Sequence, residues 1–410
     1  MNYRHPNTTK ESPGAEASAV KPPRELSNKP TAKPKTAQKP RPAMKPRVLE
    51  REKAAGDFDL AKCMAYARQH HGKSYLGQVI EMAKLAFAPM KLTPEEYYAY
   101  RLYDDKQFTE TEKYAFIGLR AQTAIHTRTN DIGWWGIAHD KLTFDAALRG
   151  LGLPRAQIHA IYHPDRMHGR VPVIRHNEDL AAYLREEMPY PFFAKPVMGM
   201  HSVGVAKVVG IDRSADELII ANAPPAKVQA FADEVVAYGT AGYLFQECLK
   251  PHVMIEEMCG PRLSTARVLI ALTDQGPVIL RSMWKIPAGC NVADNFWRSG
   301  NILAAVDAET GKVERAVQGT GPDQRWVERH PDTEELIYGA VLPDWENLKL
   351  TAIAGALAFP QLRLQAWDVA MTERGPVLLE LNVGGDFNLP QVATGRPMMD
   401  KHFVAFLESC

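Results

Sequence analysis

Residues 366–382, AWDVAMTERGPVLLELN, decide the fold prediction for this chain of 410 residues. Two apolar runs flank the turn sequence TERG, which predicts an antiparallel hairpin. Alternate residues of a strand share a face, so Glu380 and Asn382 point the same way, and the partner strand can bring Asp368 beside them. Two carboxylates and an amide oxygen are hard ligands that suit Mg²⁺, although the two acids could also merely cap their strands. The hairpin therefore predicts a magnesium site.

A second stretch, FFAKPVMGMHSVGV at residues 192–205, carries a lysine into a glycine-bearing loop between two expected strands. Backbone N–H groups of the loop, which holds Gly199, Ser202 and Gly204, could cradle a phosphate, and Lys195 would add a positive charge. The stretch lacks the GxxxxGK[ST] spacing of a Walker loop. A lysine at a strand end beside a glycine is also common in proteins without any phosphate site.

Residues 243–249, YLFQECL, form an apolar run that ends in Gln246 and Glu247. The exposed backbone at such a strand end could hydrogen-bond the edge of an adenine, and an ordinary strand–loop junction is the alternative. Arg267 and Lys285 adjoin predicted strands and could face a triphosphate, whereas each taken singly is a surface charge.

The sequence offers few other catalytic signatures. His201 and His252 are candidate acid–base groups, although both also have structural interpretations. The chain has no GxSxG elbow, and the mixed region has no GxGxxG after its first strand, so hydrolase and dinucleotide-binding folds are disfavoured.

The order of expected elements predicts an α+β fold with antiparallel sheets. Residues 58–128 read as helical, with Tyr75, Val79, Met82, Ala83 and Ala86 on one face and Thr93 as an N-cap. Strands are expected at 157–162, 171–175, 192–195, 203–209, 217–220, 243–247, 267–272, 278–284, 366–371 and 377–381. Helices are expected at 142–151, 177–187 and 226–237, and an amphipathic one at 345–357. We expect four segments: a tail (1–55), a helical region (56–138) and two α+β subdomains (139–247 and 248–410).

The charge distribution separates a basic tail from a mildly acidic body. Residues 1–53 hold 13 Lys and Arg against 5 Asp and Glu, although the whole chain has a net charge of +1. This proline-rich tail has few residues that could bury surface, so we expect it to be disordered. A plain linker is the first interpretation, and contact with RNA, anionic lipid or an acidic partner is the alternative.

Composition excludes several classes of protein. The chain is 45% hydrophobic and 24% charged, which is typical of a globular protein with a large core. No apolar run is long enough to span a bilayer, and the polar first residues do not resemble a signal peptide. Five scattered cysteines without a CxxC pair argue against a zinc site or a disulfide scaffold. We therefore expect a cytoplasmic protein.

Taken together and in this order, the motifs resemble the ATP-grasp superfamily, most closely its sugar-transfer associated group, over residues 98–400. The resemblance rests on FAKPV (193–197), STARV (264–268), VADNF (292–296), VDAETG (306–311), HPDT (330–333) and the WDVA and ELN ends of the hairpin. The family clamps ATP between two α+β subdomains. The loop after Lys195 has fewer glycines than is usual, and after ELN the chain has VGGD where many relatives have an arginine two residues on.

The resemblance implies a role for each matching residue. ATP phosphates would contact Lys141 and Lys195, and the adenine hinge would comprise Gln246, Glu247 and Leu249. The cofactor Mg²⁺ would be held by Asp368, Glu380 and Asn382. The catalytic pair Arg267 and Lys285 would neutralise the γ-phosphate.

The implied activity is an ADP-forming carboxylate–amine ligase that works through an acylphosphate, with a possible link to polysaccharide or cell-envelope synthesis. Its partners would be ATP, a small carboxylate and an amine, and Asp386 or His201 could serve as the base. The alternatives are a kinase that phosphorylates a small-molecule or sugar hydroxyl, a nucleotide-binding protein without turnover, and a nucleic-acid-binding protein that acts through its tail.

Overall fold

The computed structural model describes Leu49 and residues 58–199, 203–384 and 386–410. The tail expected over residues 1–55 therefore lies outside the described residues, apart from Leu49. Leu49 is buried, and its backbone amide donates to the Glu234 carboxylate at 2.9 Å. The five cysteines are free. None of the helices in the described ranges has the length and apolar composition that crossing a bilayer requires.

A run of helices precedes the first strand, which confirms the helical prediction for residues 58–128. They are α1 (Leu60–His71), α2 (Tyr75–Phe87), α3 (Pro94–Ala99), α4 (Glu110–Tyr114), α5 (Leu119–Thr129), the short 3₁₀ helix η1 (Ile132–Trp134), α6 (Trp135–His139) and α7 (Lys141–Gly150). The N-cap at Thr93 is also confirmed. The Thr93 hydroxyl accepts from the Glu96 amide at 3.2 Å, and the Glu96 carboxylate accepts from the Thr93 amide at 2.8 Å.

The buried face of α2 differs from the predicted one. The sequence spacing placed Tyr75 and Val79 inward, but their side chains are 43% and 50% exposed. Gln78 is buried instead, because its amide donates to two backbone carbonyls and accepts from the Tyr98 hydroxyl. Three hydrogen bonds thus satisfy the buried Gln78 side chain. The hydrophobic periodicity of the sequence cannot predict these bonds.

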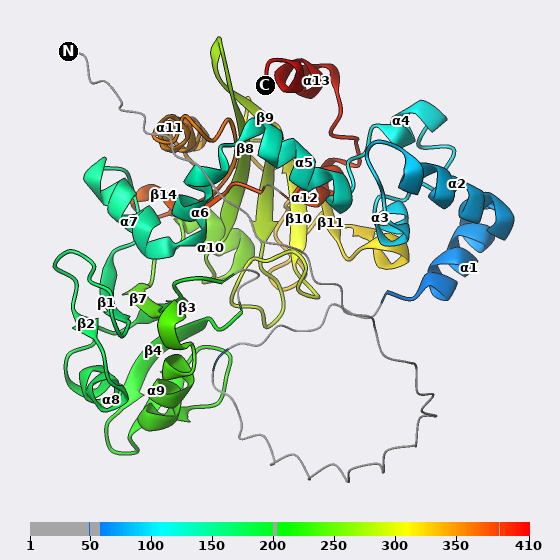
Figure 1. The fold of residues 1–410 in the computed structure, drawn as a ribbon. Helices are drawn as coiled ribbons and strands as arrows, with labels where there is room; N and C mark the ends of the chain where they lie inside the picture. The colour runs from blue at the N-terminus through cyan, green and yellow to red at the C-terminus, as the bar shows by residue number, and fades with distance from the viewer. Residues whose placement is uncertain (1–48, 50–57, 200–202, 385) are drawn as a thin grey trace, which may run out of the picture. The chain divides into compact units, whose positions relative to one another are not determined.

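The first sheet contains the strands of the chain's middle third, in the order β2-β1-β7-β3-β4-β5-β6. They are β1 (Ile158–Tyr162), β2 (Val173–Ile174), β3 (Phe192–Pro196), β4 (Ala206–Asp212), β5 (Glu217–Ile220), β6 (Ala226–Lys227) and β7 (Tyr243–Glu247). All neighbours are antiparallel except β1 and β2. The helices α8 (Asn177–Glu186) and α9 (Val228–Val236) supply buried residues to this sheet's core, and Figure 1 shows them beside it.

The second sheet is entirely antiparallel, in the order β12-β11-β10-β9-β8-β13-β14. Its strands are β8 (Thr265–Thr273), β9 (Gly276–Ile286), β10 (Ile302–Val306), β11 (Val313–Gln318), β12 (Arg325–Trp326), β13 (Leu364–Thr372) and β14 (Gly375–Asn382). The predicted hairpin is β13–β14. The sequence did not predict β10 and β11. Because β10 is buried at every residue, it lacks the apolar–polar alternation that marks a half-exposed strand.

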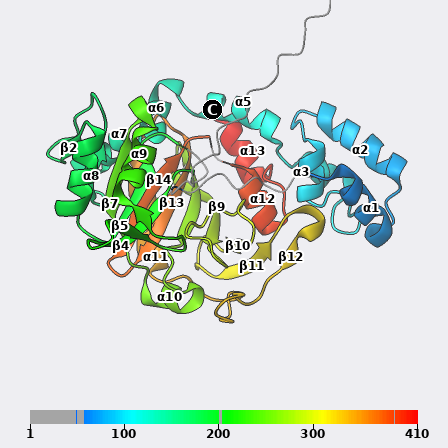
Figure 2. The same cartoon turned by 90° about the horizontal axis from the view of Figure 1, so that it is seen from below.

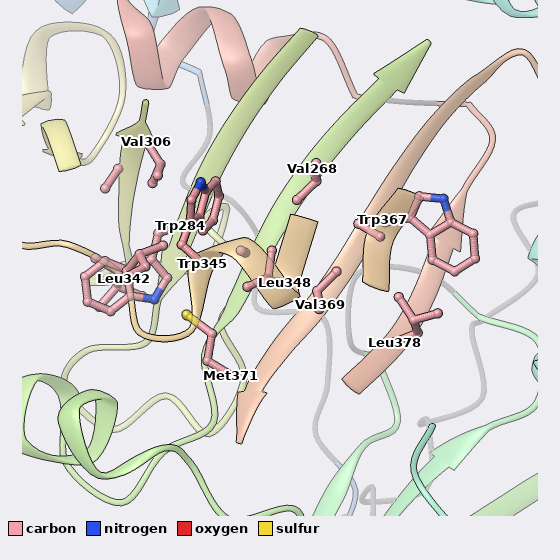
Figure 3. Packing of buried hydrophobic residues seen from close by; sticks show 14 of the residues in the cluster. Val268, Trp284, Val306, Leu342, Trp345, Leu348, Trp367, Val369, Met371 and Leu378 are labelled. Carbon is pink, nitrogen blue, oxygen red and sulfur yellow. The ribbon is translucent and has the colours of Figure 1, made fainter. Parts of the chain in front are cut away.

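Helices cover both faces of the second sheet. On one face α11 (Trp345–Leu357) and α10 (Val253–Cys259) pack over a core that includes Trp284 and Trp367, as Figure 3 shows for α11 residues such as Leu348. On the other face α12 (Asn388–Thr394) lies across β9, β10 and β11, next to α13 (Lys401–Glu408) in Figure 2. The predicted helix α11 is confirmed, but its outer face exposes Leu350 and Leu357, so it is less amphipathic than expected.

Gly311, in the turn between β10 and β11, is held against the tryptophan that begins α11. Its φ is +74°, and a Cβ added there would lie 2.5 Å from Trp345. We expect Gly311→Ala to lower the free energy of unfolding by about 2 kcal/mol, from backbone strain and overpacking. Chemical denaturation would measure this loss.

Gly339→Ala is the matched control, because Gly339 has a similar φ of +79° but nothing within 4 Å of the added Cβ. This variant should show the backbone cost alone. Equal losses in the two variants would mean that contact with Trp345 contributes nothing.

Candidate functional site

A pocket lies between the first sheet and the hairpin of the second. Helix α7 and strands β1, β3, β7 and β14 all contribute to its wall. The lining residues are Lys141, Phe144, Asp145, Leu148, Arg155, Ala156, Ile158, Lys195, Leu244, Gln246, Leu378 and Leu379. Three residues singled out in the sequence, Lys141, Lys195 and Gln246, therefore meet in one place. The apolar members of the wall were not anticipated, because nothing in a short apolar run shows which of its residues border a cavity.

The two lysines face the pocket in different electrostatic states. The Lys141 ammonium donates to the Gly199 carbonyl at 3.0 Å and lies 3.7 Å from the Glu380 carboxylate. The Lys195 ammonium group has no hydrogen bond or ion pair with any described residue. Burial, together with the charge of Lys141, lowers the pKa of Lys195 from its usual 10.5 to about 8. An unpaired, partly buried ammonium in a pocket is suited to an anionic ligand.

The glycine-bearing loop is only partly described. Ser202 and His201 lie outside the described residues, so their predicted roles stay predictions. Gly204 has a φ of +75°, and its carbonyl accepts from the Tyr243 hydroxyl. A Cβ there would collide with the Tyr238 hydroxyl. These contacts give Gly204 a packing role that the sequence reading did not foresee.

The three residues expected at the adenine hinge differ in whether their side chains are free to contact a ligand. Gln246 is buried and lines the pocket. The Glu247 carboxylate is occupied, since it accepts from the Gln157 amide at 2.7 Å and from the Arg374 guanidinium at 2.6 Å. Leu249 follows the strand and does not line the pocket. The Glu247 backbone amide is occupied as well, because it donates to the Gln157 carbonyl at 2.9 Å.

Arg267, Lys285 and Asp368 form a buried charge cluster on three neighbouring strands. Arg267 donates to both Asp368 oxygens, at 2.7 and 2.8 Å, and Lys285 donates to one of them at 3.0 Å. Burial opposes the charged form, but Arg267 and Lys285 hold the pKa of Asp368 well below its usual range. Lys285 also lies 3.5 Å from Asp294, a pairing that the sequence did not reveal. The predicted catalytic pair is thus brought together, and Asp368 connects its members.

Loop 287–301 carries Asp294 and is held by two buried asparagines, Asn301 and Asn291, which are themselves hydrogen-bonded at 2.9 Å. The Asn301 amide oxygen accepts from the Ala288 amide at 3.0 Å, and its nitrogen donates to the carbonyls of Ala293 and Asn295 at 2.9 and 2.7 Å. Asn301 therefore fixes the loop that places Asp294 beside Lys285. A central asparagine in a polar loop gives no sequence signal of this role.

The metal prediction can be tested against the donor set. Asp368 and Glu380 are directly opposite each other in the hairpin, and Asn382 lies two residues further on. The Asn382 amide nitrogen is buried without a hydrogen-bond partner among the described residues, a costly state that an acceptor such as a phosphate oxygen, and not a metal ion, would relieve.

Both Asp368 oxygens are already bonded to cations, and no group of three or more His, Cys, Asp or Glu residues in the described ranges could hold a metal by itself. Mg²⁺, however, takes only one or two carboxylates and leaves other positions to phosphate and water. Glu380 and Asn382 fit such a site.

Among the candidate bases in the described residues, Asp386 is the one whose carboxyl group is affected by the charge of Arg267, a member of the charge cluster. Its carboxylate accepts from the Trp297 indole at 3.1 Å and the Asn388 amide at 3.0 Å, and it forms no ion pair with a described residue. Burial raises the pKa of Asp386, and the charge of Arg267 partly offsets this. His252 instead caps α10, where its ring accepts from the Met254 amide.

Comparison with known proteins supplies a family match. The family model described as sugar-transfer associated ATP-grasp matches residues 122–404. A search of curated proteins found no match.

Solved structures with a similar fold are distant from this chain. The L-amino acid ligase from Bacillus licheniformis is 13% identical with a TM-score of 0.37, and the match covers 75% of this chain and 54% of that one. The D-alanyl-alanine synthetase A from Vibrio cholerae is 13% identical with a TM-score of 0.38, covering 67% and 64%. The D-alanine–D-alanine ligase from Helicobacter pylori is 12% identical with a TM-score of 0.37, covering 69% and 64%. The chain thus spans less than two thirds of the length of these proteins.

Proposed function

Because the chain belongs to the sugar-transfer associated ATP-grasp family, we propose that it is an ATP-dependent, ADP-forming ligase that joins a carboxylate to an amine. The observation that carries this proposal is the pocket lined by Lys141 and the unpaired Lys195, with the Glu380 carboxylate of the hairpin 3.7 Å from the Lys141 ammonium. Cations close to a carboxylate are what a magnesium–triphosphate ligand requires.

Each wall of the pocket has a proposed role in binding ATP, and because the cavity holds only about 30 Å³ in this structure, the walls must move apart to admit the nucleotide. Lys141 and Lys195 bind phosphates, and the apolar side chains Ile158, Leu244 and Leu379 enclose the adenine. The backbone that follows Glu247, as far as Leu249, hydrogen-bonds the edge of the ring. The segments 139–247 and 248–410 then act as the two subdomains that enclose the nucleotide.

The metal position follows from the same arrangement. Glu380 and Asn382 would hold Mg²⁺, and Asp368 would join them when its bonds to Arg267 and Lys285 loosen. The ion would supply charge stabilisation on the phosphate oxygens.

The proposed reaction has two steps. A carboxylate oxygen of the substrate attacks the γ-phosphorus, the bond to the bridging oxygen breaks, and ADP leaves with the electron pair. Arg267 and Lys285 neutralise charge on the transferred group. The amine then attacks the acyl carbon of the acylphosphate, and phosphate leaves. Asp386 takes the proton that the amine loses.

The family's description associates it with sugar transfer, so we place the acceptor in polysaccharide or cell-envelope synthesis. We also propose a cytoplasmic location, because the proposed reaction consumes ATP. Product analysis separates this ligase from a kinase with the same residues, because a ligase yields an amide and a kinase yields a phosphate ester.

Calorimetric titration of ATP with and without Mg²⁺ tests the proposal. We expect the wild-type protein to bind ATP more tightly with Mg²⁺. In Glu380→Gln, which removes one ligand charge, the affinity with Mg²⁺ should fall about tenfold. Glu373→Gln is the control, because Glu373 lies in the turn of the same hairpin, is exposed, and does not line the pocket.

Two outcomes would contradict the proposal. The first is a wild-type protein that does not bind ATP under either condition. The second is ATP binding that is indifferent both to Mg²⁺ and to Glu380→Gln, which would leave a nucleotide-binding protein without the ligase chemistry.

A further inference from the structure

A second pocket, of about 350 Å³, adjoins the pocket assigned to the nucleotide. It lies between α7, strand β1, the connection from β1 to β2, and α8. It shares Asp145, Arg155 and Ile158 with the pocket assigned to the nucleotide. Nothing in the proposed reaction uses its remaining residues.

Three arginines line this second pocket, and only one of them is paired with an acid. Arg155 donates to Asp145 at 2.7 Å, and the other Asp145 oxygen is bonded to His168 at 2.8 Å. The guanidinium groups of Arg149 and Arg170 have no hydrogen bond or ion pair with any described residue. Arg149 and Arg170, both exposed, therefore line the same cavity, and neither is bonded to an acid.

Arg149 is positioned by the backbone of the β1–β2 connection. Gly169 has a φ of +58°, and a Cβ added there would lie 2.9 to 3.3 Å from three atoms of the Arg149 guanidinium. The guanidinium therefore occupies the space that a side chain at Gly169 would fill. Arg170 follows directly in the chain, so the same turn brings both cations to the pocket.

The rest of the lining favours an anion that carries an organic group. Glu187 is the one lining acid without a partner in the described chain, so two unpaired positive charges outweigh one negative charge. His159 adds a half-buried imidazole, whose pKa is lowered by burial, so that it is a neutral hydrogen-bonding group at pH 7. Tyr183 and Pro172 supply an aromatic and an apolar surface.

We propose that this pocket is a binding site for an organic phosphate, held by Arg149 and Arg170 with its organic group against Tyr183. A phosphate dianion matches two unpaired guanidinium groups, whereas a monocarboxylate would leave one of them unneutralised. The site goes beyond the proposed ligase reaction and does not depend on it.

Titration of phenyl phosphate into the full-length protein, followed by calorimetry, tests the site. We expect binding to wild type, and affinity at least about tenfold weaker in the double variant Arg149→Ala/Arg170→Ala. Benzoate, which has the same ring and a single charge, should bind more weakly than phenyl phosphate. The single variant Arg170→Gln should show an intermediate loss and guards against misfolding of the double variant.

Two further variants locate the binding. Arg213→Ala removes an exposed arginine in the turn between β4 and β5 that does not line the pocket, and should leave the affinity for phenyl phosphate unchanged. Lys195→Met alters the nucleotide pocket and should also leave it unchanged.

The site is overturned if wild type fails to bind phenyl phosphate, if both arginine variants bind it as wild type does, or if Lys195→Met alone abolishes binding. Failure of ATP to bind would overturn the ligase proposal and leave this one standing, because the probe and the variants differ.

Discussion

Arg267→Ala is expected to lower the free energy of unfolding by about 3–5 kcal/mol, the largest loss that we anticipate for a polar substitution in this protein. The side chains of Arg267 and Asp368 are only 12% and 5% exposed. Removing the guanidinium leaves the Asp368 carboxylate buried with Lys285 as its remaining partner. A buried charge that loses its main partner keeps its full desolvation cost, so the loss exceeds the net value of the pair.

Arg185→Ala is the matched control for this measurement. Arg185 binds Asp216 with the same two-pronged geometry, at 2.7 and 2.9 Å, but these side chains are 35% and 45% exposed. Water replaces the lost contacts of an exposed pair, so the stability of this variant should be nearly unchanged. Denaturant titration of both variants would measure the contrast. Equal stability of Arg267→Ala and wild type would mean that Asp368 is neutralised in some other way.

Lys195→Met is expected to weaken ATP binding about 100-fold, which corresponds to about 2.7 kcal/mol. The ammonium has no partner in the described protein, so its charge is free to interact with a phosphate, and the pocket's low dielectric strengthens that interaction. Methionine keeps the length of the side chain and removes only the charge. Calorimetric titration of ATP at pH 7 would measure the effect, and the exposed Lys227→Met on β6 is the control.

The lowered pKa of Lys195 predicts that the affinity for ATP depends on pH. With a pKa of about 8 in the free protein, Lys195 is mostly charged at pH 7 and mostly neutral at pH 9.5. Phosphate favours the charged form, so ATP binding should take up a proton above pH 8, and affinity should fall as pH rises through this range. In Lys195→Met this part of the pH dependence should disappear. A wild-type affinity that stays constant from pH 7 to about pH 9.5 would contradict the lowered pKa.

The local patterns of the sequence predicted most elements of the fold. The hairpin of residues 366–382, the N-cap at Thr93 and the helix over 345–357 all depend on neighbouring residues, and all three are present. The secondary-structure prediction failed for elements whose position depends on burial in the tertiary structure. Strand β10 has no polar face to alternate with, and the inner face of α2 carries Gln78, whose hydrogen-bond partners are up to 20 residues away.

The sequence by itself determined which residues could carry the chemistry, because charge, hydrogen-bonding capacity and strand alternation belong to the residues themselves. It placed Glu380 and Asn382 on one face of a strand and offered Lys141, Lys195, Arg267 and Lys285 as cations. Only the tertiary structure decided which of these charges are neutralised. Arg267 and Lys285 are bonded to Asp368 across neighbouring strands, while Lys195 has no partner in the described chain. That difference depends on distances between strands that are far apart in the sequence, and the electrostatic energy of each charge depends on those distances and on burial.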